Sequence, residues 1–159
     1  MLTHTTLNGT RVQYKVSGQG RAVILLHGWG CNITTMASIE AILAPHFTVY
    51  TLDFPGFGGS DVPSEVWGVE EYTRMVEAFV AQEHIENPIL IGHSFGGRVS
   101  ILYGSRNETH KIVLVDAAGA KPRRPLKYYI KVYSYKLYKQ LLYLTMGKER
   151  AEAKLEAHR

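Results

Sequence analysis

Short apolar runs alternate with helical stretches through the first 120 residues, and this alternation restricts the fold more than any other feature of the chain. The apolar runs, which have the length of buried strands, are residues 22–27, 47–52, 88–91 and 111–115. The stretches with helical spacing are residues 34–44, 69–86 and 95–105. Such alternation is typical of an α/β fold with a mostly parallel sheet and flanking helices.

A β-hairpin is predicted at the start of the chain. Residues 2–7 and 10–16 flank Asn8-Gly9, the dipeptide that most strongly favours a tight two-residue hairpin turn. We therefore expect two antiparallel strands ahead of the parallel part of the sheet.

The alternation stops at 121–125 (KPRRP), which divides the chain into residues 1–120 and 121–159. Residues 126–144 form one amphipathic helix, ended near Gly147, and a charged helical segment follows over 148–158. The apolar face of the long helix consists of Leu126, Tyr129, Ile130, Tyr133, Leu137, Leu141 and Leu144.

Charge is distributed unevenly between the two parts. Residues 1–120 carry 7 Lys and Arg against 11 Asp and Glu, whereas residues 121–159 carry 11 against 3. A basic segment can indicate a nucleic-acid or membrane contact. A solvated helix face explains it with fewer assumptions, because no nucleic-acid motif accompanies it. We therefore expect neither nucleic acid nor membrane as a partner, and the tyrosine- and lysine-rich segment 121–143 leaves an interaction module as an alternative.

Composition limits the remaining classes of protein. A hydrophobic fraction of 45% and a charged fraction of 20% are ordinary for a globular domain. The single cysteine, Cys31, excludes an internal disulfide framework and a thiolate-rich metal site. We expect a cytoplasmic protein without a signal peptide, since the N-terminus lacks a basic region followed by an apolar one.

The sequence Gly92-His93-Ser94-Phe95-Gly96, followed by Gly97, joins the strand at 88–91 to the helix at 95–105. A G-x-S-x-G motif in this setting is typical of a nucleophile elbow, a sharp turn that exposes a serine hydroxyl. The backbone N–H of Phe95, at a helix N-terminus, would then face a developing oxyanion. The alternative is a glycine-rich turn without chemistry.

A second motif, His27-Gly28-Trp29-Gly30, directly follows the strand at 22–27. A serine hydrolase needs a second N–H donor opposite the elbow, and we expect Trp29 to supply it. Gly28 and Gly30 would let the main chain approach the substrate closely. The alternative is a tight turn with Trp29 in the core.

A third motif, residues 53–61 (DFPGFGGSD), follows the strand at 47–52. We interpret it as a structural loop that walls the pocket, and neither Asp53 nor Asp61 as catalytic.

In this order and spacing, the three motifs resemble those of the α/β-hydrolase superfamily. They are most similar to its small capped esterases and carbon–carbon bond hydrolases, such as the pimeloyl-ester carboxylesterase and meta-cleavage-product hydrolases. The resemblance implies an α/β-hydrolase fold truncated after its sixth strand, with residues 121–159 as an incomplete helical cap. It also implies a triad in the order serine, acid, histidine, with the acid after the seventh strand and the histidine after the eighth, so both are expected to be absent from this chain.

Other acidic and basic residues of the chain are candidates for the roles of the absent triad acid and histidine. Asp116, at the end of the strand at 111–115, is a candidate acid, or it caps the following turn. His27 and His93 are structural in the resembling family, although either remains an alternative base. His110 precedes its strand and should lie away from the elbow, and His158 is next to the last residue.

These features predict a serine hydrolase of esters or related acyl or carbon–carbon bonds, with a small-molecule substrate and no metal or organic cofactor. Without its triad partners the isolated chain should be nearly inactive. The alternative is a receptor-like protein that binds a small ligand without turnover. The apolar strand at 111–115 should form a bare sheet edge, which a second chain or a missing C-terminal segment would complete.

Overall fold

A computed structural model describes residues 2–119 and 125–156 of the chain. The chain divides into two compact units, Met1–Ala120 and Lys121–Arg159, each of which is described by itself.

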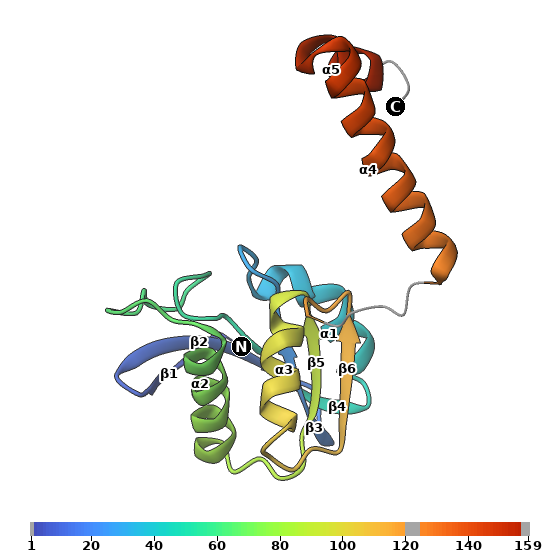
Figure 1. The fold of residues 1–159 in the computed structure, drawn as a ribbon. Coiled ribbons are helices and arrows are strands. Elements are labelled where there is room, and N and C mark those ends of the chain that lie inside the picture. Colours follow the sequence, from blue (N-terminus) through green and yellow to red (C-terminus); the bar gives the residue numbers. More distant parts are fainter. Residues whose placement is uncertain (1, 120–124, 157–159) are drawn as a thin grey trace. The chain divides into compact units, whose positions relative to one another are not determined.

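The first unit is built on one six-stranded sheet (Figure 1). Its strands are β1 (Leu2–Leu7), β2 (Thr10–Ser17), β3 (Arg21–Leu26), β4 (Phe47–Leu52), β5 (Ile89–His93) and β6 (Lys111–Val115). Its helices are η1 (Ile33–Met36), a 3₁₀ turn, and α1 (Ala37–Leu43), α2 (Val69–Gln82) and α3 (Phe95–Gly104).

The strands lie in the order β1-β2-β4-β3-β5-β6. β1 and β2 are antiparallel to their neighbours, and β4, β3, β5 and β6 are parallel. The hairpin turns at Asn8 (φ 51°) and Gly9 (φ 81°), two left-handed residues in succession, as its sequence predicts. The expected mostly parallel α/β fold is confirmed.

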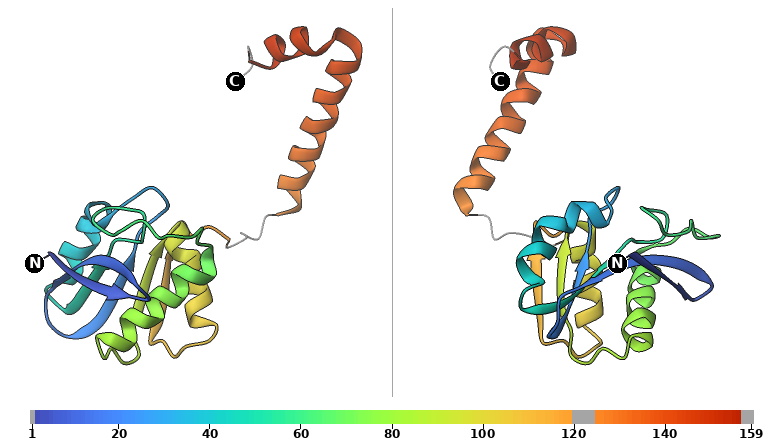
Figure 2. Two further views of the ribbon diagram at one scale, coloured as in Figure 1. Left: turned by 90° about the vertical axis from the view of Figure 1, so that its left-hand side faces the viewer. Right: turned by 180° about the vertical axis from the view of Figure 1, so that it is seen from behind.

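Helices cover both faces of this sheet, with α2 and α3 on one side and η1 and α1 on the other (Figure 2). Alternate residues along each parallel strand therefore enter different cores. On β3, Ile24 and Leu26 pack with α2 and α3, and Val23 and Leu25 pack with η1 and α1. All four are at most 1% exposed, so this strand is buried on both faces.

The helix expected over residues 69–86 ends earlier, at Gln82. His84 has a φ of 52°, which a right-handed helix cannot include. The N–H of Ile85 donates to the carbonyl of Val80 at 3.0 Å, and that of His84 donates to Ala81 at 3.2 Å. This left-handed C-terminal cap turns Ile85 back onto the core, which explains its apolar character without a helical position.

β6 is an edge strand, because it pairs with β5 alone among the described strands. Val113, Leu114 and Val115 are 37%, 41% and 36% exposed. The sheet thus has an open apolar border on the side where the elbow lies.

The second unit contains α4 (Leu126–Met146) and α5 (Lys148–Glu156), which are separated by Gly147 at φ 77°. In α4 the buried residue is Leu142, and Ala151 of α5 is also buried. The apolar stripe expected along α4 is exposed throughout; for example, Leu126 is 75% exposed and Leu144 is 84% exposed. None of the described helices is long and apolar enough to cross a membrane.

Candidate active site

Ser94 occupies a sharp turn between β5 and α3. Its φ of 48° and ψ of −107° lie outside the regions that L-residues ordinarily adopt. The turn is held through its own peptide groups: the Ser94 N–H donates to the Val115 carbonyl at 3.1 Å, and its carbonyl accepts from Gly97 at 3.1 Å and Ala118 at 2.9 Å. The side chain is partly exposed and makes no capping hydrogen bond to α3. A strained serine whose hydroxyl has no hydrogen-bond partner among the described residues is compatible with the predicted nucleophile elbow.

The glycines around Ser94 are required by close packing. A Cβ on Gly96 would overlap the carbonyl oxygens of Leu26 and His27, and one on Gly92 would overlap the Gly96 carbonyl and the Ser100 hydroxyl. A Cβ on Gly97 would overlap the side chain of Ala117. The first turn of α3 therefore sits directly against the end of β3, and the Gly96 N–H donates to His27 O at 3.1 Å.

The loop after β3 lies against the elbow. A Cβ placed on Gly28 would be 3.3 Å from the Ser94 Cβ and 2.9 Å from Nδ1 of His93. Gly30 has a φ of 75°, and Cys31 N–H closes a turn onto the Gly28 carbonyl at 3.1 Å. In the described part of the chain, the N–H groups of Trp29 and Phe95 donate to no protein acceptor. Both amides are thus unpaired within the described residues, and their role as an oxyanion hole stays a prediction.

His27 is fully buried behind this loop, and both of its ring nitrogens are engaged. Nδ1 lies 2.8 Å from the Gly28 carbonyl, and Nε2 lies 3.0 Å from the Phe54 N–H, from which it accepts. Burial lowers the pKa of this imidazole, so the neutral ring, with its proton on Nδ1, is the stable form. Its two contacts join the ends of β3 and β4, and neither nitrogen is free to act as a base toward Ser94.

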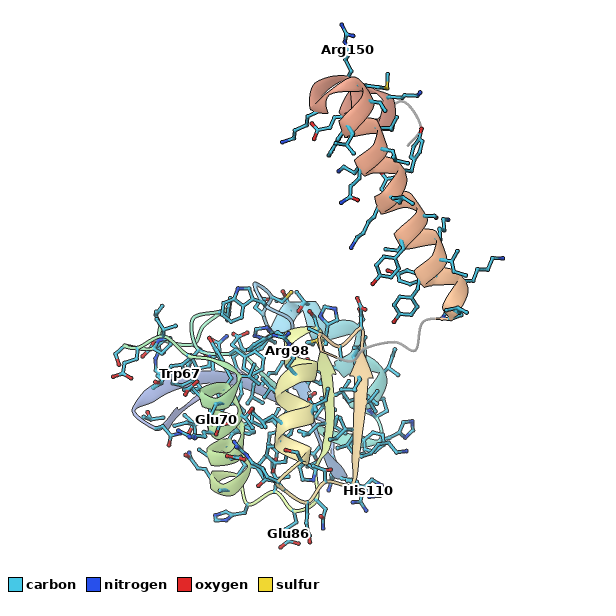
Figure 3. All side chains as sticks on the ribbon, viewed as in Figure 1. Trp67, Glu70, Glu86, Arg98, His110 and Arg150 are labelled. Atoms are coloured by element: carbon cyan, nitrogen blue, oxygen red, sulfur yellow. The ribbon has the colours of Figure 1, made fainter. Side chains whose placement is uncertain are left out.

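The other histidines are dispersed. The His93 ring is partly exposed and lies against Gly28. His110 is at the opposite end of the sheet, where its N–H donates to the Pro88 carbonyl at 3.0 Å. Figure 3 shows His110 far from Arg98, which follows Ser94 by about one turn of α3. His158 lies outside the described residues.

Asp116 follows β6 at the edge of the sheet that carries Ser94. Its φ of 45° places it in a tight turn between Val115 and Ala118, both of which hydrogen-bond the Ser94 peptide groups. Its side chain is exposed. The turn brings the main chain around Asp116 next to the elbow, and its role as an acid stays a prediction.

Asp53 is almost completely buried, at 1% exposure, and both oxygens of its carboxylate accept hydrogen bonds from neighbouring loops and strands. Oδ1 accepts from the Ile33 N–H at 2.7 Å, and Oδ2 accepts from Gln13 Nε2 at 2.8 Å and from the Gly59 N–H at 2.9 Å. Asp53 thereby ties the loop after β3 to the loop after β4. Asp61 instead forms an exposed ion pair with Arg11 at 2.9 Å.

A cluster of aromatic side chains, which the sequence motifs do not reveal, lies beside the elbow. The Trp29 ring contacts those of Phe57, Tyr72 and Phe95 at centroid distances of 4.9, 6.1 and 5.1 Å. Trp67 joins through Tyr72 at 5.3 Å. Tyr72 is buried, whereas Trp29 is 61% exposed. The expectation that Trp29 is either an amide donor or plain core is therefore incomplete, since its indole faces solvent.

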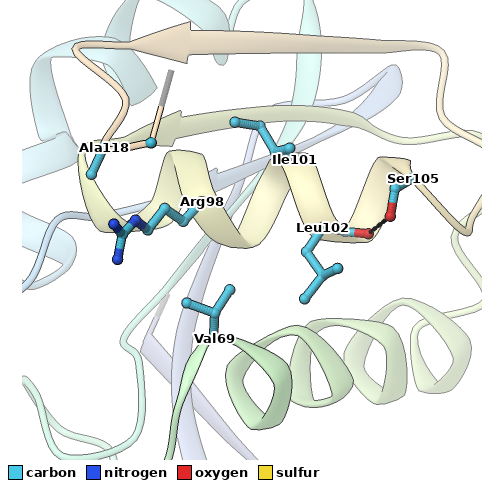
Figure 4. Close-up of a pocket in the computed structure, with 7 residues that line it drawn as sticks. Val69, Arg98, Ile101, Leu102, Ser105 and Ala118 are labelled. Carbon is cyan, nitrogen blue, oxygen red and sulfur yellow. Dashed lines mark hydrogen bonds between the residues drawn. The ribbon is translucent and has the colours of Figure 1, made fainter. Parts of the chain in front are cut away.

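A groove of about 330 Å³ runs along the outer side of α3 (Figure 4). It is lined by Val69, Arg98, Ile101, Leu102, Ser105, Ala118 and Gly119. Ser94 and the two amides do not line it, so it is separate from the site where the hydroxyl emerges. Across the described residues, no group of three histidine, cysteine or carboxylate side chains is placed to hold a metal ion.

Comparison with known proteins identifies relatives of this chain. The model of the alpha/beta hydrolase family matches residues 23–149. A pimeloyl-(acyl-carrier protein) methyl ester esterase of Pectobacterium carotovorum is 38% identical over 108 residues, which are 66% of this chain and 40% of that protein. A soluble epoxide hydrolase of Corynebacterium is 29% identical over 119 residues, 72% of this chain and 42% of that protein.

The fold has solved counterparts as well. A crystal structure of a bacterial membrane phospholipase A superposes with a TM-score of 0.74 at 24% identity, over 84% of this chain and 45% of that one. The chain spans about 40% of the length of the curated relatives named above.

Proposed function

Because the chain belongs to the alpha/beta hydrolase family, we propose that it carries the nucleophile half of a serine hydrolase that cleaves esters or related acyl or carbon–carbon bonds. One observation carries the proposal: the strained Ser94 lies against the 28–30 loop, and the N–H groups of Trp29 in that loop and of Phe95 are unpaired among the described residues. A reducing cytoplasmic setting suits its single, unpaired Cys31.

In the proposed reaction the Ser94 hydroxyl attacks the carbonyl carbon of the substrate. The carbonyl oxygen becomes negatively charged and accepts hydrogen bonds from the two amides, which are already oriented before the reaction begins. The serine proton must pass to a base and then to the leaving group. None of the described histidines hydrogen-bonds the Ser94 hydroxyl, and His27 has no free ring nitrogen.

We therefore expect Ser94-dependent labelling without efficient turnover. A fluorophosphonate probe should modify this chain slowly, and the Ser94→Ala chain should stay unlabelled. Hydrolysis of 4-nitrophenyl acetate should remain near background, since loss of a triad histidine typically lowers kcat by about 10⁶. A chain whose Ser94 never reacts with the probe would contradict the hydrolase proposal. Rapid Ser94-dependent turnover would instead contradict the expected inactivity and direct attention to His93.

A second function, ligand binding without turnover, is favoured by one specific observation. The site offers exposed aromatic surface at Trp29, and among the described residues no histidine hydrogen-bonds the serine hydroxyl. A receptor of this kind would bind a small ligand with equal affinity in the intact and Ser94→Ala chains and would resist the phosphonate probe.

A further inference from the structure

We propose that the exposed indole of Trp29, supported by the rings of Phe57, Tyr72 and Phe95, forms a platform that binds the neutral, apolar acyl group of the substrate. The inference rests on the proposed function, because the platform borders the site of Ser94. It adds the chemical class of the group that the site accepts.

The position of the indole relative to the reacting atoms is the first support. Phe95 directly follows Ser94 in the chain, and its ring contacts that of Trp29 at a centroid distance of 5.1 Å. A Cβ placed on Gly28, which precedes Trp29, would be 3.3 Å from the Ser94 Cβ. An acyl group attached to Ser94 would therefore have this pair of rings beside it.

The second support is that three neighbouring rings pack against the indole and fix its position. Phe57, Tyr72 and Phe95 contact its ring edge-to-face, with interplanar angles of 74°, 82° and 76°. Tyr72 is 3% exposed, and its hydroxyl donates to the Pro55 carbonyl at 2.9 Å. Although its neighbours are buried or half-buried, 61% of Trp29 remains exposed. A large apolar surface on a fixed base is suited to a ligand, because little side-chain freedom is lost on binding.

The arrangement selects against charge, which is the third support. The rings that contact Trp29 are uncharged, and His27 behind them is in its neutral form. Tight binding of a quaternary ammonium group typically uses several ring faces that converge as a cage, because one exposed ring face attracts a cation only weakly. Here the rings meet edge against face, and Trp29 alone among them is more than half exposed. A single platform of this kind favours alkyl or aryl acyl groups.

The test is equilibrium binding, so it does not depend on turnover. The Ser94→Ala, Trp67→Phe chain keeps Trp29 as its single tryptophan, because the sequence has two. Its fluorescence should be quenched saturably by 4-nitrophenyl butyrate, with binding tighter than that of the acetate by about fourfold for each added methylene. The succinyl and 4-(trimethylammonio)butyryl esters, which carry a negative and a positive charge at the same chain length, should bind at least tenfold more weakly than the butyrate.

Equilibrium dialysis then identifies the residue. Trp29→Ala in the Ser94→Ala chain should abolish the dependence on acyl length, whereas Ile42→Ala, which removes another exposed apolar side chain (73%), should preserve it. Circular dichroism checks that each variant is folded. Non-saturable quenching, equal binding of a charged ester, or a length dependence that survives Trp29→Ala would overturn the proposal. If acyl selectivity is found while the phosphonate probe fails to label Ser94, the platform stands and the hydrolase function fails.

Discussion

Ser94 combines a conformation that L-residues disfavour with a side chain on which the proposed chemistry depends. Its positive φ is maintained by hydrogen bonds to Val115, Gly97 and Ala118, all made through the main chain. Because these hydrogen bonds do not involve the side chain, the backbone strain at Ser94 can be changed by substitution independently of the loss of its hydroxyl group. Residues strained in this way cost on the order of 1–3 kcal/mol and cluster at functional sites.

Ser94→Gly should therefore stabilise the fold, because glycine adopts this conformation without a Cβ clash. After allowance for the greater freedom of glycine in the unfolded chain, the free energy of unfolding should rise by about 1 kcal/mol. Ser94→Ala, which keeps the Cβ, is the matched control and should leave stability nearly unchanged. Urea denaturation of the three chains measures this, and equal midpoints for the glycine and alanine variants would show that the turn is unstrained.

His27 gives stability a dependence on pH. Its pKa in the folded chain is lowered by burial, so the unfolded chain binds a proton more readily than the folded one below the ordinary value of 6.5. The contribution of the neutral ring to the free energy of unfolding is fully present above pH 6.5 and is lost as the pH falls toward the folded pKa. The free energy of unfolding then changes by at most about 1.4 kcal/mol per pH unit.

The His27→Gln chain checks this dependence. Its free energy of unfolding should be lower at pH 7.5, because the contacts with Gly28 and Phe54 are altered, and should vary less than that of the unaltered chain between pH 7.5 and 5. Parallel pH profiles for the two chains would exclude His27 as the source of the dependence.

At the scale of elements, β6 holds the elbow and is also the open border of the sheet. Parallel strands normally lie between neighbours and are covered on both faces. Here Val113 and Val115 emerge on the α1 side, and Leu114 emerges on the α3 side, all more than one third exposed. Such an edge is a template for pairing with another strand.

We expect the chain to self-associate through β6. Val113→Lys, which places a charge at the centre of the strand, should reduce light scattering at high protein concentration, because a charged edge disfavours strand pairing. Ile42→Lys, on α1, adds the same charge at another exposed apolar position and is the control. If both variants reduce scattering equally, net charge and not the sheet edge is responsible.

For the whole molecule, the candidate site is assembled from segments that are distant in sequence but share one end of the sheet. The loops after β3 and β4, the elbow after β5 and the turn after β6 all follow the carboxyl ends of parallel strands, which by topology meet at one edge. Asp53 and His27 join the first two loops, and the peptide groups of Ser94 join the last two.

The elements and their order along the chain were predictable because each depends on local features. The apolar periodicity predicts the strands to within a few residues. Asn8-Gly9 predicts the hairpin, and Gly147 predicts the end of α4. The predicted end of α2 was wrong because Ile85 contacts the core without being helical. The left-handed conformation of His84 turns the chain so that Ile85 packs there.

The motifs predicted that the 28–30 loop lies against Ser94, but they did not predict the cluster of rings around Trp29 or the support from Gln13. The orientation of Trp29 depends on Phe57, Tyr72 and Phe95, and the hydrogen bond from Gln13 to Asp53 spans 40 positions. Neither has a signal within a short window, since spacing along the chain does not specify which distant side chains pack together.

The hydrogen bonds between Ser94 and the β6 turn have a mechanical consequence. The N–H and the carbonyl of Ser94 both hydrogen-bond the segment 115–118, so a displacement of β6 would strain these bonds and shift the serine. A strand that pairs with β6 would therefore act on the turn that orients the Ser94 hydroxyl. Occupancy of the β6 edge and the orientation of Ser94 are in this way mechanically coupled.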